Sequence, residues 1–154
     1  MDYIAQFVTS FIGSAAFGII FNVPRESVFK CGLVGALGWI CYFGLSEIGL
    51  SIIGATAAAS SLIAIISQTF ARFYKTPMII FTVGGIIPLV PGGMAYNAMR
   101  NFVENNYSEA ITLAAKAFLI SGSIAIGLVF SEVLYQLFMK LWSKKNMFKK
   151  AADN

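Results

Sequence analysis

The chain has 154 residues, of which 58% are apolar and only 12% are charged, and its mean hydropathy is +0.77. Soluble domains carry about 25% charged residues, so this composition argues against a water-soluble domain and predicts an all-α integral membrane protein. The length allows one domain and about five spans, because each span needs roughly 20 residues. The absence of histidine excludes a Ser-His-Asp triad, a Cys-His pair and a histidine metal site.

Three apolar runs open the chain, over residues 3–21, 31–46 and 52–71. No Lys or Arg precedes the first run, so we interpret it as a mature span rather than as a signal peptide, which would have a basic start. Pro24 ends the first helix in a polar turn, and Gly49 and Ser51 allow a tight turn before the third run. The short basic loop 72–77 then leads to the fourth run.

The fourth run is unusual because residues 78–90 number only 13, too few for an ordinary span. Gly84, Gly85 and Pro88 lie inside it, and Pro91-Gly92-Gly93 follows directly. We therefore predict four to five transmembrane helices, the fourth broken at this Pro-Gly-Gly segment. Two alternatives stay open: a broken span that crosses the membrane, and a re-entrant element that returns to the side from which it came.

The last part of the chain reads as one long helix over residues 109–142, preceded by a polar turn in which Ser108 could cap it. At about 1.5 Å per residue this helix would exceed 45 Å, so its basic end should project beyond the hydrocarbon. We predict a single polytopic membrane domain over 1–143 and a basic cytoplasmic tail over 144–154, frayed beyond Lys144. The lysines of this tail would serve first as a topological anchor and second as a site for anionic lipid.

The distribution of Lys and Arg predicts the orientation of the spans. With five crossings, nine of the eleven basic residues fall on one side, and only Arg100 and Lys116 fall on the other. This split favours an outside N-terminus, a cytoplasmic C-terminus and a fourth run that crosses the membrane. A re-entrant fourth run would worsen the split.

Small residues recur at steps of four on three of the runs. They are Ser10, Ser14, Gly18 and Asn22 on the first, Gly54 and Ala58 on the third, and Ser123, Gly127 and Ser131, followed by Tyr135, on the last. Such stripes let helices approach closely in lipid, and we interpret them as helix packing. The alternative is that one stripe docks a second protein. Cys31 and Cys41 are interpreted as small packing residues.

The segment from Gly84 to Asn97 is the best candidate for chemistry. A proline lacks the amide that would bind the carbonyl four residues back, so Pro88 should free the carbonyl of Gly84, and Pro91 that of Ile87. Freed backbone groups persist in a bilayer only where protein or a water-lined cavity satisfies them. Secondary transporters use such breaks, with the N-terminus of a half-helix aimed at an anionic group.

A half-helix that starts near Gly93 would present a carboxylate-binding set of backbone amides and side chains. The predicted substrate-binding residues are Gly92, Gly93, Tyr96, Asn97 and Arg100, and the predicted hinge residues are Gly84, Gly85, Pro88 and Pro91. The alternative is a kinked structural helix whose polar end reaches the interface, with Arg100 paired to Glu104. Weaker candidates are Lys116 and Glu132 for a proton relay, and Gln68 with Ser60 and Ser61 for lining a path.

The stretch Gly85-Ile-Ile-Pro-Leu-Val-Pro-Gly-Gly93, followed by Tyr96 and Asn97, resembles the signature of the bacterial threonine/serine exporter family. The chain is similar over nearly its whole length to that family's C-terminal membrane domain, which in some members is a separate small subunit. The Pro-Leu-Val-Pro-Gly-Gly core carries the specificity of the match. The matched positions are Pro88, Pro91, Gly92, Gly93 and Tyr96, whereas Arg100 rests on helix geometry alone.

The resemblance implies a membrane subunit of a secondary exporter in the bacterial inner membrane. The exported solute would be threonine or serine, or in some split systems a dicarboxylate such as succinate. The resemblance also implies a larger partner membrane subunit with the family's other domain, and the small-residue stripes suggest a homo-oligomer as well. The alternative is a non-transporting accessory subunit. We expect no enzymatic activity, because an intramembrane Asp pair and a Gly-x-Ser-x-Gly elbow are missing, and we expect no cofactor, metal or nucleic-acid partner.

Overall fold

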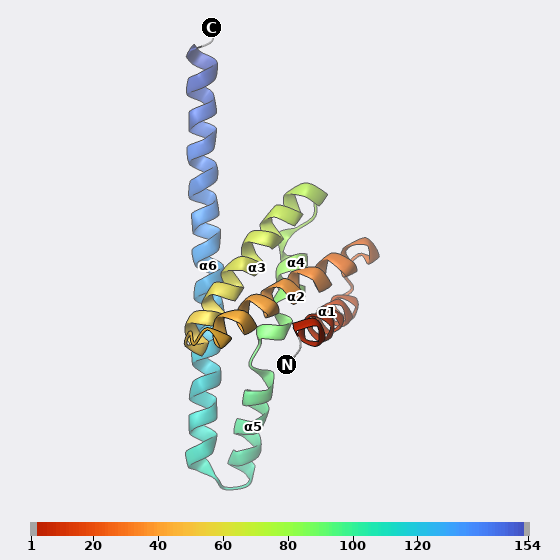
Figure 1. Cartoon of the computed structure of the whole chain (residues 1–154), viewed down its shortest axis with the longest axis vertical. Coiled ribbons are helices and arrows are strands. Elements are labelled where there is room, and N and C mark those ends of the chain that lie inside the picture. Colours follow the sequence, from red (N-terminus) through yellow and green to blue (C-terminus); the bar gives the residue numbers. More distant parts are fainter. Residues whose placement is uncertain (1–2, 153–154) are drawn as a thin grey trace.

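The computed structural model describes the backbone of residues 3–152 and the side chains of that range except 139 and 141–152. These residues form helices and no strand (Figure 1). The helices are α1 (Tyr3–Ile20), α2 (Arg25–Glu47), α3 (Ile52–Tyr74), α4 (Met78–Ile86), the short 3₁₀ helix η1 (Ile87–Leu89), α5 (Gly92–Val103) and α6 (Tyr107–Ala152).

Among the described residues, four stretches of helix are long and apolar enough to cross a membrane: α1, α2, α3 and the Tyr107–Phe138 part of α6. A fifth candidate is the pair formed by Met78–Leu89 and Gly92–Val103, which is bent by 52°. The prediction of an all-α membrane protein with four to five spans is therefore confirmed. Length and composition leave both alternatives for the bent pair, a broken span and a re-entrant element.

The helix boundaries differ from the sequence prediction mainly at polar segments. Helix α2 begins at Arg25, six residues earlier than the apolar run, because Pro24 is its N-cap and a polar first turn is compatible with a helix. The predicted cap Ser108 lies inside α6, which begins at Tyr107. The backbone of α6 stays helical to Ala152, although the sequence predicts that the helix frays beyond Lys144. The side chains of the predicted basic tail lie outside the described residues.

The core forms where α2, α3, α4 and α6 meet, and it depends on small residues. Cys31 on α2 is fully buried, and its thiol donates a hydrogen bond to the carbonyl oxygen of Ile80 on α4 at 3.4 Å. A Cβ atom on Gly84 would lie 2.9 Å from the Cβ of Cys31, and one on Gly85 would lie 2.6 Å from a methyl group of Val34. These glycines therefore let α4 approach α2 closely.

Helices α3 and α6 form a second close contact, which we call the α3–α6 seam. The hydroxyl of Ser123 donates to the carbonyl of Ile53 at 2.5 Å, and the hydroxyl of Ser131 donates to the carbonyl of Ser61 at 3.1 Å. Both pairs are 70 residues apart in the sequence, so α3 and α6 run parallel. Two antiparallel helices would pair residues whose numbers sum to a constant instead.

The small-residue stripes are used within the chain. On α1, Ser10, Ser14 and Gly18 are the buried positions, and α1 packs mainly against α2. On α6, Ser123 and Ser131 are buried in the α3–α6 seam. The interpretation of these two stripes as helix packing agrees with the structure. The pair Gly54 and Ala58 on α3 does not follow this pattern. Ala58 is exposed, and the buried face of α3 contains Ala55 and Ala59 instead.

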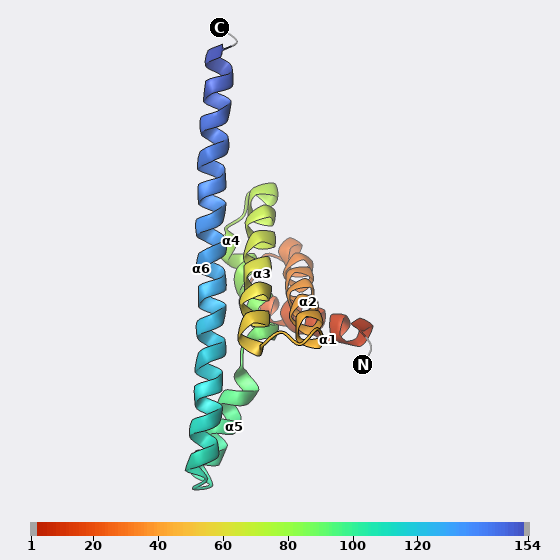
Figure 2. The ribbon, with the colours of Figure 1, turned by 60° about the vertical axis from the view of Figure 1, so that its left-hand side comes forward.

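The two ends of the helical block carry different contacts. At one end the Nζ of Lys30 lies 3.4 Å from the ring centre of Tyr74, and the guanidinium of Arg72 lies 4.7 Å from that of Tyr135. At the other end, Tyr3 donates a hydrogen bond to the carboxylate of Glu47. Helix α5 and the first turns of α6 form a hairpin that projects beyond the block (Figure 2).

Candidate functional site

The break between α4 and α5 takes five residues. Helix α4 ends at Ile86, η1 follows, Val90 has extended backbone angles, and α5 begins at Gly92 with Pro91 as its N-cap. Pro88 has no N–H for the carbonyl of Gly84. The prediction that Pro91 frees the carbonyl of Ile87 is wrong, because the N–H of Val90 donates to that carbonyl at 3.3 Å. The tighter 3₁₀ turn supplies the donor that the proline lacks.

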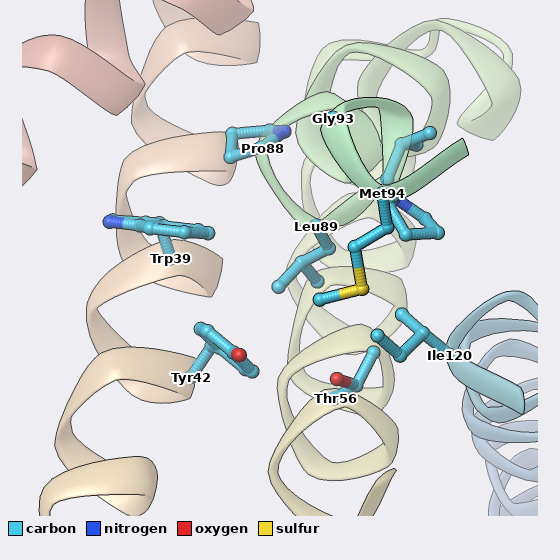
Figure 3. A pocket seen from close by; sticks show the side chains of 10 residues that line it. Trp39, Tyr42, Thr56, Pro88, Leu89, Gly93, Met94 and Ile120 are labelled. Atoms are coloured by element: carbon cyan, nitrogen blue, oxygen red, sulfur yellow. The ribbon is translucent and has the colours of Figure 1, made fainter. Parts of the chain in front are cut away.

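A cavity of about 240 Å³ opens at this break, which we call the break cavity (Figure 3). Its walls come from α2, α3, the break itself, the start of α5, and α6. They are formed by Trp39, Tyr42, Thr56, Pro88, Leu89, Val90, Pro91, Gly93, Met94 and Ile120. Pockets for drug-sized ligands usually measure about 300–1,000 Å³, so the break cavity suits a smaller solute.

The N-terminus of α5 leaves backbone donors at the edge of this cavity. The N–H of Gly92 donates to the carbonyl of Val90 at 2.8 Å, and that of Ala95 donates to the carbonyl of Pro91 at 3.0 Å. The N–H groups of Gly93 and Met94, between them, donate to no acceptor in the part of the chain that the structure describes. Both residues line the cavity. Free N–H groups at the positive end of a helix dipole favour an anion.

The glycines around the break fall into two groups. Gly84 and Gly85 lie inside α4 rather than at the bend, and close contacts with α2 account for them. A Cβ atom on Gly92 or Gly93 would meet no atom within 4 Å, and neither residue has a positive φ angle. Neither packing nor backbone conformation in this chain therefore requires glycine at 92 and 93. Close approach of a ligand to the backbone is a further use of glycine that these positions allow.

The side chains that the sequence grouped with these glycines lie elsewhere. Tyr96, Asn97 and Arg100 are exposed on α5, and none of them lines the break cavity. The Nε of Arg100 lies 2.8 Å from a carboxylate oxygen of Glu104, and the side chain of Arg100 is 62% exposed. The structure thus places Gly93 and Pro88 at one cavity and leaves the three polar side chains on an open helix face.

The residues predicted as weaker candidates for a proton relay or a solute path do not form one site either. Lys116 and Glu132 are exposed on α6. Ser61 belongs to the α3–α6 seam, where its hydroxyl donates to the carbonyl of Gly127 at 3.0 Å. Gln68 is only 5% exposed, and both polar atoms of its amide lack a hydrogen-bond partner.

Several cavity residues were missed by sequence reasoning. Trp39 and Tyr42 lie one helical turn apart on α2, inside an apolar run, and the sequence offers no sign that they face the break. Ile120 comes from α6, far along the chain. Aromatic residues three apart were a weak signal for a shared helix face. Only the packing of α2 against η1 turns that face into a cavity wall.

A comparison with known families matches residues 6–134 to the family described as "Threonine/Serine exporter, ThrE". The chain belongs to the threonine/serine exporter family. The match covers most of the chain and confirms the resemblance carried by the Pro-Leu-Val-Pro-Gly-Gly core. This is a family of transporters, so the chain is a multi-pass membrane component of a threonine/serine exporter. No solved structure matches this member of the exporter family.

Proposed function

We propose that this chain is the membrane subunit of a secondary exporter for small carboxylate-bearing solutes, and that the solute binds in the break cavity. The observation that carries the proposal is the pair of free N–H groups on Gly93 and Met94, which border that cavity. They would hold the carboxylate of the solute at the N-terminus of α5. Binding there requires no basic side chain in the cavity wall.

The rest of the lining favours a hydroxy amino acid over a dicarboxylate. The hydroxyl of Thr56 donates to the carbonyl of Ile52 at 2.7 Å, and its oxygen can still accept a hydrogen bond. Trp39, Leu89 and Met94 are apolar neighbours for a short side chain. A dicarboxylate such as succinate would need a second set of donors, and the lining contains no Lys or Arg. Threonine and serine are therefore the first candidates, and succinate is the second.

The role of Tyr96, Asn97 and Arg100 as further ligands stays a prediction. These side chains lie on the outer face of α5, so they would join the site only where another surface covers that face. We propose the larger membrane subunit of the same family as that surface, with a second copy of the chain as the alternative. Helix α5 packs chiefly on α6, and exposed Met99, Phe102 and Val103 leave it an apolar face.

We further propose five crossings of the bacterial inner membrane, with the N-terminus outside and the C-terminus in the cytoplasm. The parallel direction of α3 and α6 supports this topology. If α3 and α6 cross in the same direction, the chain between them must return across the membrane, and only α4, η1 and α5 lie between them. A re-entrant element would make α3 and α6 antiparallel.

Reporter fusions test this topology. Fusions after Phe73 and after Lys145 should both report the cytoplasm, and a fusion after Asn105 should report the outside. A cytoplasmic signal after Asn105 would contradict the five-crossing proposal and support the re-entrant alternative.

An efflux assay on a matched pair of glycine variants tests the solute site. Gly93→Leu fills the space beside the free N–H groups. Gly122→Leu adds the same side chain on α6, at a glycine where an added Cβ atom would also meet no atom within 4 Å. We expect Gly93→Leu to lower threonine and serine efflux per folded molecule at least tenfold, and Gly122→Leu to leave it unchanged. Equal efflux from both variants would favour the alternative, a non-transporting accessory subunit. Parallel assays with succinate distinguish the two solute classes.

A further inference from the structure

A second cavity, of about 250 Å³, lies on the α1 side of the break, and we call it the α1 cavity. Its polar lining comes from α1, which contributes Gln6, Thr9 and Ser10. Trp39 and Pro88 belong to its wall and also to the wall of the break cavity. The two cavities therefore lie on opposite sides of a shared partition.

Trp39 is held in this partition by a specific contact. Its indole Nε1 donates a hydrogen bond to the side-chain oxygen of Gln6 at 2.7 Å. Figure 3 shows the indole nitrogen pointing away from Thr56 and Met94, which line the break cavity. The hydrogen bond thus anchors the indole from the α1 side, while the remainder of the ring borders the break cavity. Pro88 cannot add a backbone donor on either side.

The polar groups of the α1 cavity have hydrogen-bonding capacity to spare. The hydroxyl of Thr9 donates to the carbonyl of Ala5 at 2.9 Å, and that of Ser10 donates to the carbonyl of Gln6 at 2.7 Å. Each oxygen can still accept a hydrogen bond. The oxygen of Gln6 is used by Trp39, so its amide NH₂ remains a donor without a partner among the described residues. The lining therefore offers acceptors and donors but no charge.

We propose that the α1 cavity is a second station on the same solute path, binding the ammonium or hydroxyl group of a small amino acid. Trp39, anchored by Gln6, is the partition that the solute must pass between the two stations. The proposal rests on the proposed function of the break cavity. It assigns a binding role to α1, and it explains why Gln6, Thr9 and Ser10 line a cavity beside the break.

The binding part is tested by removing both hydroxyls from the α1 wall. Thr9→Val combined with Ser10→Ala should raise the KM for threonine efflux about tenfold, measured in cells that lack the native gene and carry the variant. The matched control is Thr69→Val, because exposed Thr69 donates to the carbonyl of Ile65 at 2.8 Å and lines neither of these two cavities. Thr9→Ser keeps a hydroxyl and should retain a nearly unchanged KM.

The partition is tested by releasing the indole. Gln6→Leu and Trp39→Phe each remove the hydrogen bond, and each should raise the efflux of phenylalanine relative to threonine about fivefold. Gln136→Leu is the control, because it removes an exposed glutamine on α6. An unchanged efflux ratio in both variants would overturn the partition.

These outcomes separate the two proposals. If wild-type cells export neither threonine nor serine through this chain, the proposed function fails. If wild-type export is present and the Thr9→Val, Ser10→Ala variant has the same KM as Thr69→Val, only the second station is overturned. The amount of folded protein in the membrane is measured for every variant, and Thr9→Ser shows whether any change comes from the hydroxyl or from packing.

Discussion

The α3–α6 seam and the α4–α5 break differ in whether their polar groups have hydrogen-bond partners. In the seam, Ser123 and Ser131 on α6 donate to carbonyls of α3, and a Cβ atom on Gly127 would lie 2.0 Å from the hydroxyl oxygen of Ser60. At the break, the N–H groups of Gly93 and Met94 have no partner among the described residues and border a cavity.

The difference shows that glycine has two uses in these helices. Gly127 allows two helices to touch, so any side chain there would push them apart. A Cβ atom on Gly93 would meet no atom within 4 Å, so this glycine leaves space and exposes the backbone instead. A small residue in these helices therefore indicates packing when neighbouring helices fill the space beside it. Open space indicates a candidate site only where a cavity and free backbone donors adjoin it, as at Gly93.

The largest effect should come from filling the seam. Gly127→Leu would place a side chain where even a Cβ atom lies 2.5 Å from the carbonyl oxygen of Ala57, so α3 and α6 must separate. We expect a large loss of folded protein, since overpacking a well-packed core typically costs about 1–3 kcal/mol. Thermal melting in detergent, with Gly122→Leu as the control, measures this effect. Equal melting temperatures would contradict the close packing of the seam.

The next effect should come from removing the break. Replacing both prolines, with Pro88→Ala and Pro91→Ala, should let the helix run on and cover the free N–H groups of Gly93 and Met94. Stability should hold or rise, because an interior proline costs about 3 kcal/mol. Threonine efflux per folded molecule should fall about tenfold or more. If efflux instead tracks the amount of folded protein, the break is a structural kink and not a binding site.

A smaller effect is expected at Gln68, where a buried amide without partners lies on the same helix as the seam residues. Gln68→Leu should raise stability by about 1 kcal/mol, because an unpaired buried polar group is unfavourable. Differential scanning calorimetry in detergent measures this change in stability. A drop in threonine efflux without a loss of folded protein would show that the amide serves the solute path, which would place a functional group beside the seam.

The smallest effect is expected at Arg100. Its contact with Glu104 is an exposed ion pair between residues four apart, and solvent screening leaves such pairs little effect on stability. Arg100→Gln should therefore hardly change stability. An increase in the KM for threonine would support Arg100 as a ligand covered by a partner subunit. An unaltered KM would restrict the site to the backbone of α5 and the break cavity.

The sequence by itself determined the class of protein, the approximate spans and the place of the break. Composition and run length lead to these conclusions because lipid requires long apolar helices, and because proline and glycine act on their own backbone. The family was also predictable, since its specific motif is a short continuous segment. Helix ends such as Arg25 were missed, because polar residues can extend a helix beyond its apolar run.

Only the tertiary structure decided which small residues pack and which border a cavity. Gly85 and Gly93 are both glycines in the same motif, yet α2 fills the space beside Gly85 and leaves the space beside Gly93 open. Trp39 and Ile120 join the break cavity through contacts between helices that are distant in the sequence. The parallel seam of α3 and α6 likewise depends on how α4 and α5 return the chain. The local sequence does not predict these contacts, because each one depends on the relative placement of two or more helices.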